Sequence, residues 1–326
     1  MSTKDKVLDI LLKNENISVS GSEIASQIGV SRNSVWKAVR LLKESGYIIK
    51  STNNKGYMFL GAENKIKKEL IENELAKVNK LADVYVFDKI ASTNNEAKKL
   101  ASEGCIEKSL ICANSQTNGK GRLGRSFVSD GSGIYLSVVL RPRCDISKTV
   151  KITSGAAVAV KRVIEKYCDD TKIKWVNDIY IGKKKVCGIL TEAVSDFESG
   201  GVEYAVVGIG VNVFGKAEDF GAELKDIVTT MEEHLKDGKK LDKNVIVSQI
   251  YSELIDIYNS LDDFSLVMKE YRESCFVIGK QVFAVKAGER TKVTVKDVDD
   301  NGALVCEDEN KNKILLSSGE ISIRFE

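Results

Sequence analysis

Residues 116–125 read Gln-Thr-Asn-Gly-Lys-Gly-Arg-Leu-Gly-Arg, a run that mixes glycines with cations. Closely spaced glycines let backbone N–H groups approach an anion, and Lys120, Arg122 and Arg125 add positive charge. We therefore predict that residues 116–125, here called the glycine loop, form a mobile loop that contacts phosphate. Taken alone, this pattern also fits a loop that contacts nucleic acid or a flexible surface loop.

The chain around this loop has the composition of a globular protein with more than one domain. Its 326 residues are 43% hydrophobic, and its charges nearly cancel to a formal +2. This balance excludes a disordered polyelectrolyte and a protein that coats nucleic acid along its whole length. The seven cysteines include no Cys-x-x-Cys pair, so we expect a reducing cytoplasm and no disulfide framework. No apolar run reaches membrane-spanning length, and we expect no membrane association.

The only histidine, His234, lies among glutamates and a lysine. A histidine-based metal centre or a Ser-His-Asp triad is therefore not expected, and we interpret His234 as an exposed surface residue.

The N-terminal segment is locally basic. Residues 1–60 contain nine Lys or Arg and five Asp or Glu. A helical run at 23–28, preceded by Ser22, ends at Gly29, and Ser31 opens a second helix. Two β-rich runs, 46–49 and 56–60, flank a turn-rich stretch at 51–55, which predicts a hairpin.

This order of elements predicts a winged helix-turn-helix that binds DNA, because the second helix of such a motif enters the major groove. A small basic helical domain can also be a protein-docking module. The candidate DNA contacts lie on the face of the second helix opposite its apolar residues: Arg32, Asn33, Ser34, Lys37 and Arg40.

The rest of the chain divides into two further regions. A helix with Ile66, Leu70 and Val78 on its apolar face follows a polar break at 61–64. From about residue 82 to 270, short β-rich runs alternate with helical patterns such as 154–167, which predicts a mixed α/β domain. From residue 276 onward, short strands separated by turns are typical of a small β-barrel.

Three more motifs complete the pattern: Lys-Trp-Val-Asn-Asp-Ile-Tyr at 174–180, Lys-Lys-Lys-Val-Cys-Gly-Ile-Leu-Thr-Glu at 183–192, and Val-Gly-Ile-Gly-Val-Asn at 207–212. Together with the glycine loop and the Ser-Thr-Asn at 92–94, they closely resemble the biotin protein ligase family, in its class with an N-terminal repressor domain. The resemblance implies an α+β multidomain fold: a winged helix-turn-helix at 1–63, a ligase domain related to class II tRNA synthetases at 64–272, and an SH3-like barrel at 273–326.

The resemblance also implies an activity. Such an enzyme joins biotin and ATP, with Mg²⁺, into biotinyl-5'-AMP and transfers biotin to a lysine of a biotin carboxyl carrier protein. It represses transcription by binding operator DNA as a homodimer when the adenylate is bound. The glycine loop is expected to close over the adenylate, and its ordering could build the dimer surface.

Site residues are carried over from the family by position. Biotin contacts are expected at Ser92, Thr93, Asn94, Gln116, Lys120, Gly121, Arg122 and Lys185. ATP or adenylate contacts are expected at Gly119, Arg125, Phe127, Asn177 and Asn212. Catalysis is assigned to Lys185, Arg122 and Asp178, and the metal ligand to Asp178. These residue types suit the chemistry, because cations offset charge at phosphorus and uncharged groups pair with a buried ureido ring.

Three positions depart from the family pattern: Lys120 replaces an arginine, Phe127 a tryptophan and Val176 a proline. We expect none of them to abolish activity, although Val176 removes a backbone constraint from the turn that follows. Asp178 could instead be a turn former and Trp175 a core residue, and Lys183 and Lys184 could be solvated lysines without a role.

Two other functions compete with this interpretation. One is a biotin-sensing repressor that has lost ligase activity, and the other is a lipoate or other acyl-adenylate ligase.

Overall fold

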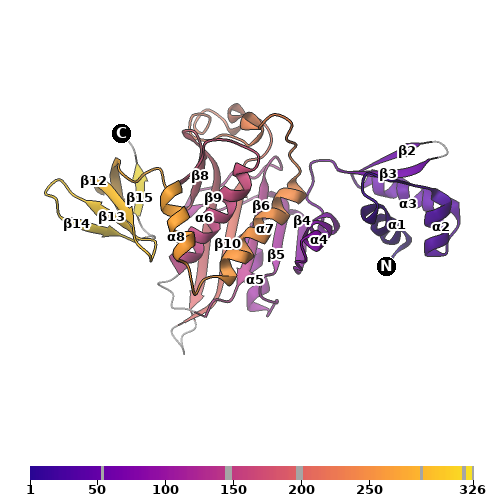
Figure 1. The fold of residues 1–326 in the computed structure, drawn as a ribbon, viewed down its shortest axis with the longest axis horizontal. Coiled ribbons are helices and arrows are strands. Elements are labelled where there is room, and N and C mark those ends of the chain that lie inside the picture. Colours follow the sequence, from indigo (N-terminus) through magenta and orange to yellow (C-terminus); the bar gives the residue numbers. More distant parts are fainter. Residues whose placement is uncertain (53–54, 144–148, 196–200, 287–288, 318–320, 325–326) are drawn as a thin grey trace. The chain divides into compact units, whose positions relative to one another are not determined.

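The computed structural model describes residues 1–52, 55–143, 149–195, 201–286, 289–317 and 321–324. By its internal contacts the chain splits into two compact units, Met1–Lys65 and Ile66–Glu326. Figure 1 labels most of their elements. Within the described ranges, no helix is both long enough and apolar enough to cross a membrane.

The first unit combines helices with a small sheet. Its elements are α1 (Thr3–Lys13), β1 (Ser18–Val19), α2 (Gly21–Ile28), α3 (Arg32–Glu44), β2 (Tyr47–Thr52) and β3 (Gly56–Ala62), with strand order β1-β3-β2. Val35 and Leu42 of α3 are fully buried in its core. The helix expected after Ser22 begins earlier, because the Ser20 hydroxyl accepts a hydrogen bond from the Glu23 N–H and caps it. Residues 53–54 of the expected turn lie outside the described residues.

The second unit is built on a mixed sheet of seven strands in the order β4-β5-β6-β10-β9-β8-β7. The strands are β4 (Val84–Ile90), β5 (Leu110–Gln116), β6 (Ile134–Leu140), β7 (Thr171–Lys174), β8 (Asp178–Ile181), β9 (Lys184–Ser195) and β10 (Val202–Val211). β4 and β5 are parallel and the other neighbours are antiparallel.

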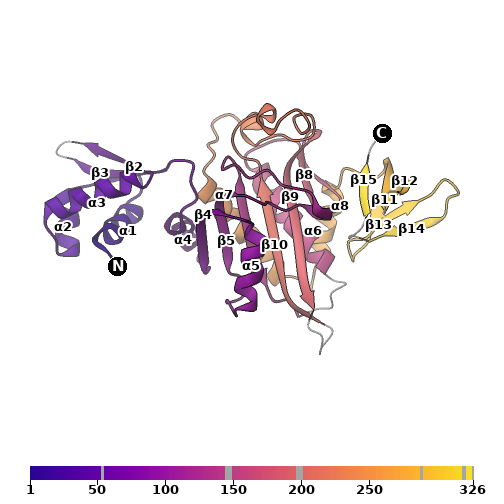
Figure 2. The ribbon, with the colours of Figure 1, turned by 180° about the vertical axis from the view of Figure 1, so that it is seen from behind.

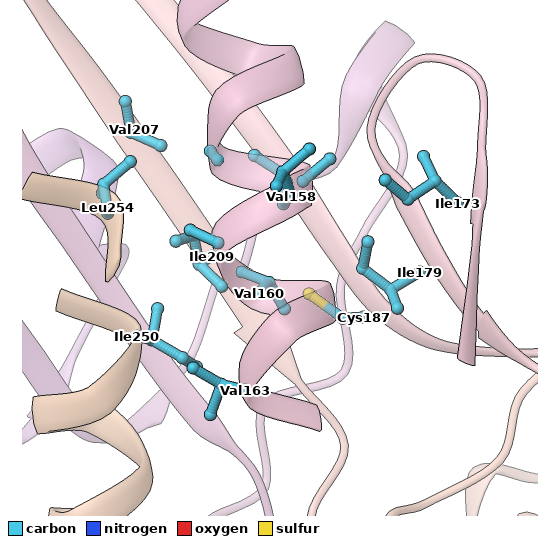
Figure 3. Packing of buried hydrophobic residues seen from close by; sticks show 14 of the residues in the cluster. Val158, Val160, Val163, Ile173, Ile179, Cys187, Val207, Ile209, Ile250 and Leu254 are labelled. Atoms are coloured by element: carbon cyan, nitrogen blue, oxygen red, sulfur yellow. The ribbon is translucent and has the colours of Figure 1, made fainter. Parts of the chain in front are cut away.

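Helices cover both faces of this sheet. One face carries α6 (Thr149–Glu165), α7 (Lys243–Asn259) and α8 (Ser265–Ser274), as Figure 1 shows, and α4 (Lys68–Lys77) packs against α7. Figure 2 shows α5 (Thr93–Ser102) on the opposite face. In the core between α6, α7 and the sheet, Val160, Ile250 and Ile209 of β10 belong to one cluster of buried hydrophobic residues (Figure 3). Burial of such aliphatic side chains is the main stabilising term of the fold.

The C-terminal strands form a separate antiparallel sheet within the second unit. They are β11 (Gln281–Lys286), β12 (Glu289–Val298), β13 (Leu304–Glu307), β14 (Lys313–Leu316) and β15 (Ile321–Arg324), in the order β14-β13-β12-β11-β15. The Trp175 Nε1 atom donates a hydrogen bond to the Gly302 carbonyl at 2.9 Å, and Arg272 Nε donates to the Val298 carbonyl at 2.6 Å. These contacts tie the small sheet to the β7–β8 turn of the central sheet and to α8.

The predicted elements mostly recur with shifted ends. β6 occupies the predicted range, and the helix expected at 154–167 spans Thr149–Glu165. Val78 is predicted on the apolar face of a helix, but α4 ends at Lys77 and Val78 is 55% exposed. Ile66, which was predicted on the same apolar face, precedes the helix but is fully buried.

Candidate functional site

A pocket of about 400 Å³ lies over β9 and β10 in the second unit. The start of α5, the end of β5, the glycine loop, the β7–β8 turn and a segment at 220–228 also line it. Thirteen of the residues predicted from the sequence line this pocket: Ser92, Thr93, Asn94, Gln116, Lys120, Gly121, Arg122, Arg125, Phe127, Asn177, Asp178, Lys185 and Asn212. Gly119 does not, and its carbonyl accepts a hydrogen bond from the Phe127 N–H instead.

The strand register orders the pocket from one end to the other. Gly208 of β10 pairs with Leu190 of β9, beside Asn94. Two residues further on, Gly210 pairs with Gly188, and Gly188 in turn pairs with Asp178. The uncharged start of α5 therefore lies at one end, and Asp178 lies at the other.

The glycine loop is closed by its own backbone. The Gly121 N–H donates to the Arg125 carbonyl at 2.7 Å, and the Phe127 N–H donates to the Gly119 carbonyl at 2.9 Å. Lys120, which the sequence assigned to the ligand, donates to Asn95 Oδ1 of α5 at 3.0 Å. The loop therefore presents Arg122 and Arg125 to the pocket while its lysine contacts α5.

Arg122 reaches from the loop to the β7–β8 turn. Its Nη1 atom donates to Asn177 Oδ1 at 3.1 Å, and Asn177 Nδ2 donates to the Ile189 carbonyl at 2.6 Å. Burial lowers the pKa of the Arg122 guanidinium, while nearby Asp178 opposes this and Arg125 adds to it. A guanidinium is not deprotonated in proteins, so Arg122 carries its charge at neutral pH. Asn177 thus fixes this cation against the central sheet.

Lys185 approaches the same turn from β9. Its ammonium lies 2.7 Å from Asp178 Oδ1. Its backbone pairs with a neighbouring segment, because the Lys185 N–H donates to the Ile227 carbonyl and the Thr229 N–H donates to the Lys185 carbonyl. The lysine is therefore held on a paired strand and its ammonium faces Asp178.

The pocket is strongly cationic. Among the described residues, one carboxylate lines the pocket, that of Asp178. Five cationic side chains line it as well: Lys120, Arg122, Arg125, Lys174 and Lys185. Such an excess of positive charge suits an anionic ligand that carries several phosphates. No group of three His, Cys, Asp or Glu side chains suited to a metal occurs in the described part of the chain. One carboxylate nevertheless fits Mg²⁺, which binds through one or two carboxylates together with substrate phosphates.

Glycines in the two central strands give the pocket its floor. A Cβ atom at Gly208 would lie 2.0 Å from Asn94 Oδ1, and one at Gly210 would lie 2.6 Å from the Phe127 ring. Both distances are far below van der Waals contact, so any side chain here would displace a site residue. Both glycines belong to the motif at 207–212 but were not predicted to have a role, although glycines inside a strand signal close approach.

Other lining residues were not predicted from the sequence. Lys174 and Tyr180 lie on β7 and β8, with the lysine ammonium 5.5 Å from the ring centroid. Phe220, Leu224, Ile227 and Val228 add an apolar wall. Lys174 and Tyr180 are the first and last residues of the motif at 174–180, and the sequence could have identified them there. The apolar wall at 220–228 carries no such sequence signal.

Trp175 is a buried core residue, as one interpretation of the sequence predicts, and it also lines the pocket. Its indole is 4% exposed and donates to the Gly302 carbonyl of the C-terminal segment. The peptide bond from Trp175 to Val176 is cis, and the Val176 carbonyl accepts a hydrogen bond from the buried Tyr271 hydroxyl at 3.1 Å. The turn that carries Asn177 and Asp178 is therefore supported by α8 and by the C-terminal sheet.

His234 is exposed, and its Nε2 atom lies 2.9 Å from Thr229 Oγ1, outside the residues that line the pocket.

The candidate DNA-binding residues lie on α3 in the first unit. Arg32, Asn33, Lys37 and Arg40 are exposed, whereas Ser34 is half-buried and its hydroxyl lies 3.0 Å from that of Ser31, the N-cap. Trp36, which was not predicted as a contact, is 48% exposed on the same helix, with the Arg40 guanidinium 5.4 Å from its ring centroid. An exposed aromatic among cations gives this face an apolar contact surface.

Comparison with protein families assigns three segments of the chain. Residues 86–212 match the biotin/lipoate A/B protein ligase family, residues 3–58 match an HTH domain, and residues 277–324 match the biotin protein ligase C terminal domain. These segments contain most of the residues that line the pocket, the helix α3 and the C-terminal sheet.

Individual relatives agree with these matches. The chain is 37% identical over 235 residues to the bifunctional ligase/repressor BirA of Bacillus spizizenii, covering 71% of each chain. It is 35% identical over 246 residues to BirA of Bacillus subtilis, covering 75% of this chain and 74% of the relative. The fold resembles a biotin protein ligase from Aquifex aeolicus in complex with biotin and ATP, with a TM-score of 0.61 at 24% identity over 76% of this chain and all of the other.

Proposed function

Because this chain belongs to the biotin/lipoate A/B protein ligase family, as a biotin protein ligase with an N-terminal helix-turn-helix repressor domain, we propose that its pocket performs both half-reactions of that enzyme. The observation that carries the assignment is the convergence of Arg122 and Lys185, from two different elements, on the turn at Asn177 and Asp178. The uncharged start of α5 lies at the opposite end of the same pocket.

In the first half-reaction, a carboxylate oxygen of biotin attacks the α-phosphorus of ATP. The new O–P bond forms as the bond to pyrophosphate breaks, and negative charge grows on the phosphoryl oxygens. Lys185 and Arg122 offset this charge from fixed positions, so little reorganisation is needed at the moment of reaction. Asn177 orients Arg122 for this role.

In the second half-reaction, the amine of an acceptor lysine attacks the carboxyl carbon of the adenylate. A C–N bond forms, the C–O bond to AMP breaks, and the amine loses a proton. The acceptor in this proposal is a biotin carboxyl carrier protein. Until it arrives, the glycine loop shields the anhydride from water, with Arg122 as its contact to the sheet.

The remaining assignments follow the order of the pocket. Ser92, Thr93, Asn94, Gln116, Lys120 and Gly121 take biotin, and Arg125, Phe127, Asn177 and Asn212 take ATP or the adenylate. Gly119, which does not line the pocket, acts by closing the glycine loop. Asp178 would hold Mg²⁺ beside the phosphates, where the cation supplies further neutralising charge.

We also propose the finer points of architecture and regulation. The N-terminal unit acts as a winged helix-turn-helix, since the β2–β3 hairpin follows α3, and the C-terminal sheet acts as an SH3-like barrel. The chain divides into three functional domains, at residues 1–63, 64–272 and 273–326. Operator DNA is bound through α3 by a homodimer that forms when the adenylate is present, in the cytoplasm.

The test of the ligase chemistry is direct. Purified protein with Mg·ATP and either biotin or lipoate is expected to form biotinyl-adenylate, and no lipoyl-adenylate, in a mass spectrum of the products. Lipoyl-adenylate as the main product would identify a lipoate ligase. Operator binding with no adenylate formed from either acid would identify a repressor without ligase activity.

A chain that begins at Asn64 is expected to biotinylate an acceptor but to lose operator binding. The boundary between the two compact units lies after Lys65, and residues 1–60 carry the excess of basic charge. Acceptor labelling and DNA mobility shift measure the two activities. Sequence-specific DNA binding by the shortened chain would place the DNA-binding surface elsewhere.

A pair of glycine substitutions separates the two ends of the pocket. Gly208→Ala is expected to raise the KM for biotin by about tenfold or more, because its Cβ displaces Asn94. Gly210→Ala is expected to raise the KM for ATP instead, because its Cβ displaces the Phe127 ring. Steady-state pyrophosphate release measures both, and thermal unfolding reports any loss of stability. Equal effects of both variants on both substrates would contradict the proposed order of the pocket.

A further inference from the structure

The side-chain amide of Asn94 is held by three partners in the protein. Asn94 is 4% exposed in the first turn of α5. Its Oδ1 atom accepts a hydrogen bond from the Ser137 hydroxyl at 2.7 Å. Its Nδ2 atom donates to Glu192 Oε2 at 2.8 Å and to the Leu190 carbonyl at 3.3 Å. Both N–H groups of the amide are therefore used within the protein.

Glu192 and Leu190 decide which way this amide faces. A reversed amide would point its own carbonyl at a carboxylate and at a backbone carbonyl, and all three groups are acceptors. Ser137 does not discriminate between the two orientations, because a hydroxyl can donate or accept. The orientation of Asn94 thus depends mainly on acceptors supplied by β9.

Glu192 is itself fixed in place as an anion. Its Oε1 atom lies 2.8 Å from the ammonium of Lys98, on the next turn of α5. Burial opposes ionisation, but the hydrogen bonds from Lys98 and Asn94 outweigh it and lower the pKa of Glu192. The carboxylate is therefore ionised at neutral pH and remains an acceptor for the Asn94 amide.

One acceptor position of Asn94 remains for a ligand. A carbonyl oxygen has two lone pairs, and Ser137 uses one of them. The Asn94 oxygen lies directly over Gly208, where a Cβ atom would approach it to 2.0 Å, and both residues line the pocket. Because a glycine forms the floor at this point, a ligand can approach the oxygen.

The second amide at this end presents the complementary group. Gln116 Oε1 accepts hydrogen bonds from the Thr93 N–H and hydroxyl, at 2.7 and 3.2 Å, and Gln116 Nε2 donates to the Ser129 hydroxyl at 2.9 Å. Within the described ranges the second N–H of Gln116 is left for a ligand acceptor. A cyclic urea carries both N–H groups and a carbonyl, whereas the dithiolane ring of lipoate carries neither.

We propose that Glu192 is a positioning residue for ligand specificity: it fixes Asn94 as a hydrogen-bond acceptor and so selects a ring with an N–H group at this end of the pocket. The inference rests on the proposed function, in which the ureido ring of biotin lies beside Asn94. Glu192 acts through Asn94, remote from the reacting carboxylate, so it contributes to binding before and during the reaction equally.

The test compares Glu192→Met, which is similar in length but lacks an oxygen acceptor and keeps only a weakly accepting sulfur, with Glu192→Gln, whose amide oxygen can still accept from Asn94. Glu192→Met is expected to raise the biotin KM about tenfold, as for a lost buried hydrogen-bond partner, with kcat within about threefold and the ATP KM unchanged. Glu192→Gln is expected to stay within about threefold of the wild type in every constant. Glu203→Met, at an exposed carboxylate of β10, is the matched control.

Two biotin analogues, each methylated on one ureido nitrogen, provide a readout that loss of stability alone does not change. The wild type is expected to reject one analogue far more strongly than the other. The analogue ratio, which is the kcat/KM of the accepted analogue divided by that of the rejected one, is expected to fall at least tenfold in Glu192→Met. If Glu192→Met fails to fold, Lys98→Met, which frees the Glu192 carboxylate, is expected to reduce the ratio about threefold.

An unchanged biotin KM and an unchanged analogue ratio in a folded Glu192→Met variant would overturn the inference, provided that the wild type forms biotinyl-adenylate. If Glu192→Met does not fold, an unchanged ratio in Lys98→Met would overturn it. Failure of the wild type to form the adenylate from biotin would overturn the proposed function instead.

Discussion

Lys185→Ala is expected to reduce biotinyl-adenylate synthesis by about 10²–10³-fold, the usual effect of removing one preorganised charge-stabilising group. The Lys185 ammonium lies 2.7 Å from Asp178, at the cationic end of the pocket. Two anions, the biotin carboxylate and the ATP triphosphate, have to meet there, so loss of this cation raises the barrier to their reaction. Pyrophosphate release under saturating substrates measures the effect, and thermal unfolding shows whether the variant remains folded.

Two controls separate the lost cation from other causes. Lys184→Ala removes the adjacent lysine, whose ammonium donates to the Lys225 carbonyl and does not line the pocket, and it is expected to leave the rate unchanged. Lys185→Arg keeps a cation at this position, and it is expected to retain more activity than Lys185→Ala if neutralisation of phosphate is what the alanine variant lacks. Near-normal pyrophosphate release by Lys185→Ala would show that this lysine has no catalytic role.

Arg122→Gly is expected to form the adenylate but to release it at least tenfold faster than the wild type. The hydrogen bond from Arg122 Nη1 to Asn177 Oδ1 ties the glycine loop to the β7–β8 turn, and a charge-assisted bond of this kind contributes about 1.5–3 kcal/mol. Lys185 still offsets charge during synthesis. The escaped anhydride acylates exposed lysines with little selectivity, so biotin should appear on serum albumin mixed with the variant, ATP and biotin.

Arg122→Lys is the matched variant for this prediction. It keeps the charge but loses the planar group that reaches Asn177, so an intermediate rate of escape is expected. If loop closure also builds a dimer surface, Arg122→Gly should need more biotin than the wild type to occupy its operator. A variant that retains its adenylate, labels the true acceptor alone and represses normally would show that Arg122 does not hold the loop closed.

The short motifs are the most informative part of the sequence. Their order indicates the family, and thirteen predicted residues from 92 to 212 line one pocket. Hydrophobic spacing also locates the main elements, because burial on one face of a helix or strand imposes a period that local sequence retains. Ends of elements are less certain, as Ser20 and Val78 show, because caps and tertiary packing compete with local preference.

The sequence by itself determined the family, the residue types available for catalysis and the basic character of the N-terminal segment, since these depend on composition and order alone. Tertiary structure decided what each side chain contacts. It turned Lys120 toward Asn95, placed Arg122 on Asn177, and surrounded Asn94 with Ser137 and Glu192. The physical reason is that hydrogen bonds and ion pairs act over about 3 Å, whereas these partners lie from 25 to 98 positions apart in the chain. Only the pairing of strands and the packing of α5 on the sheet bring such groups within that range.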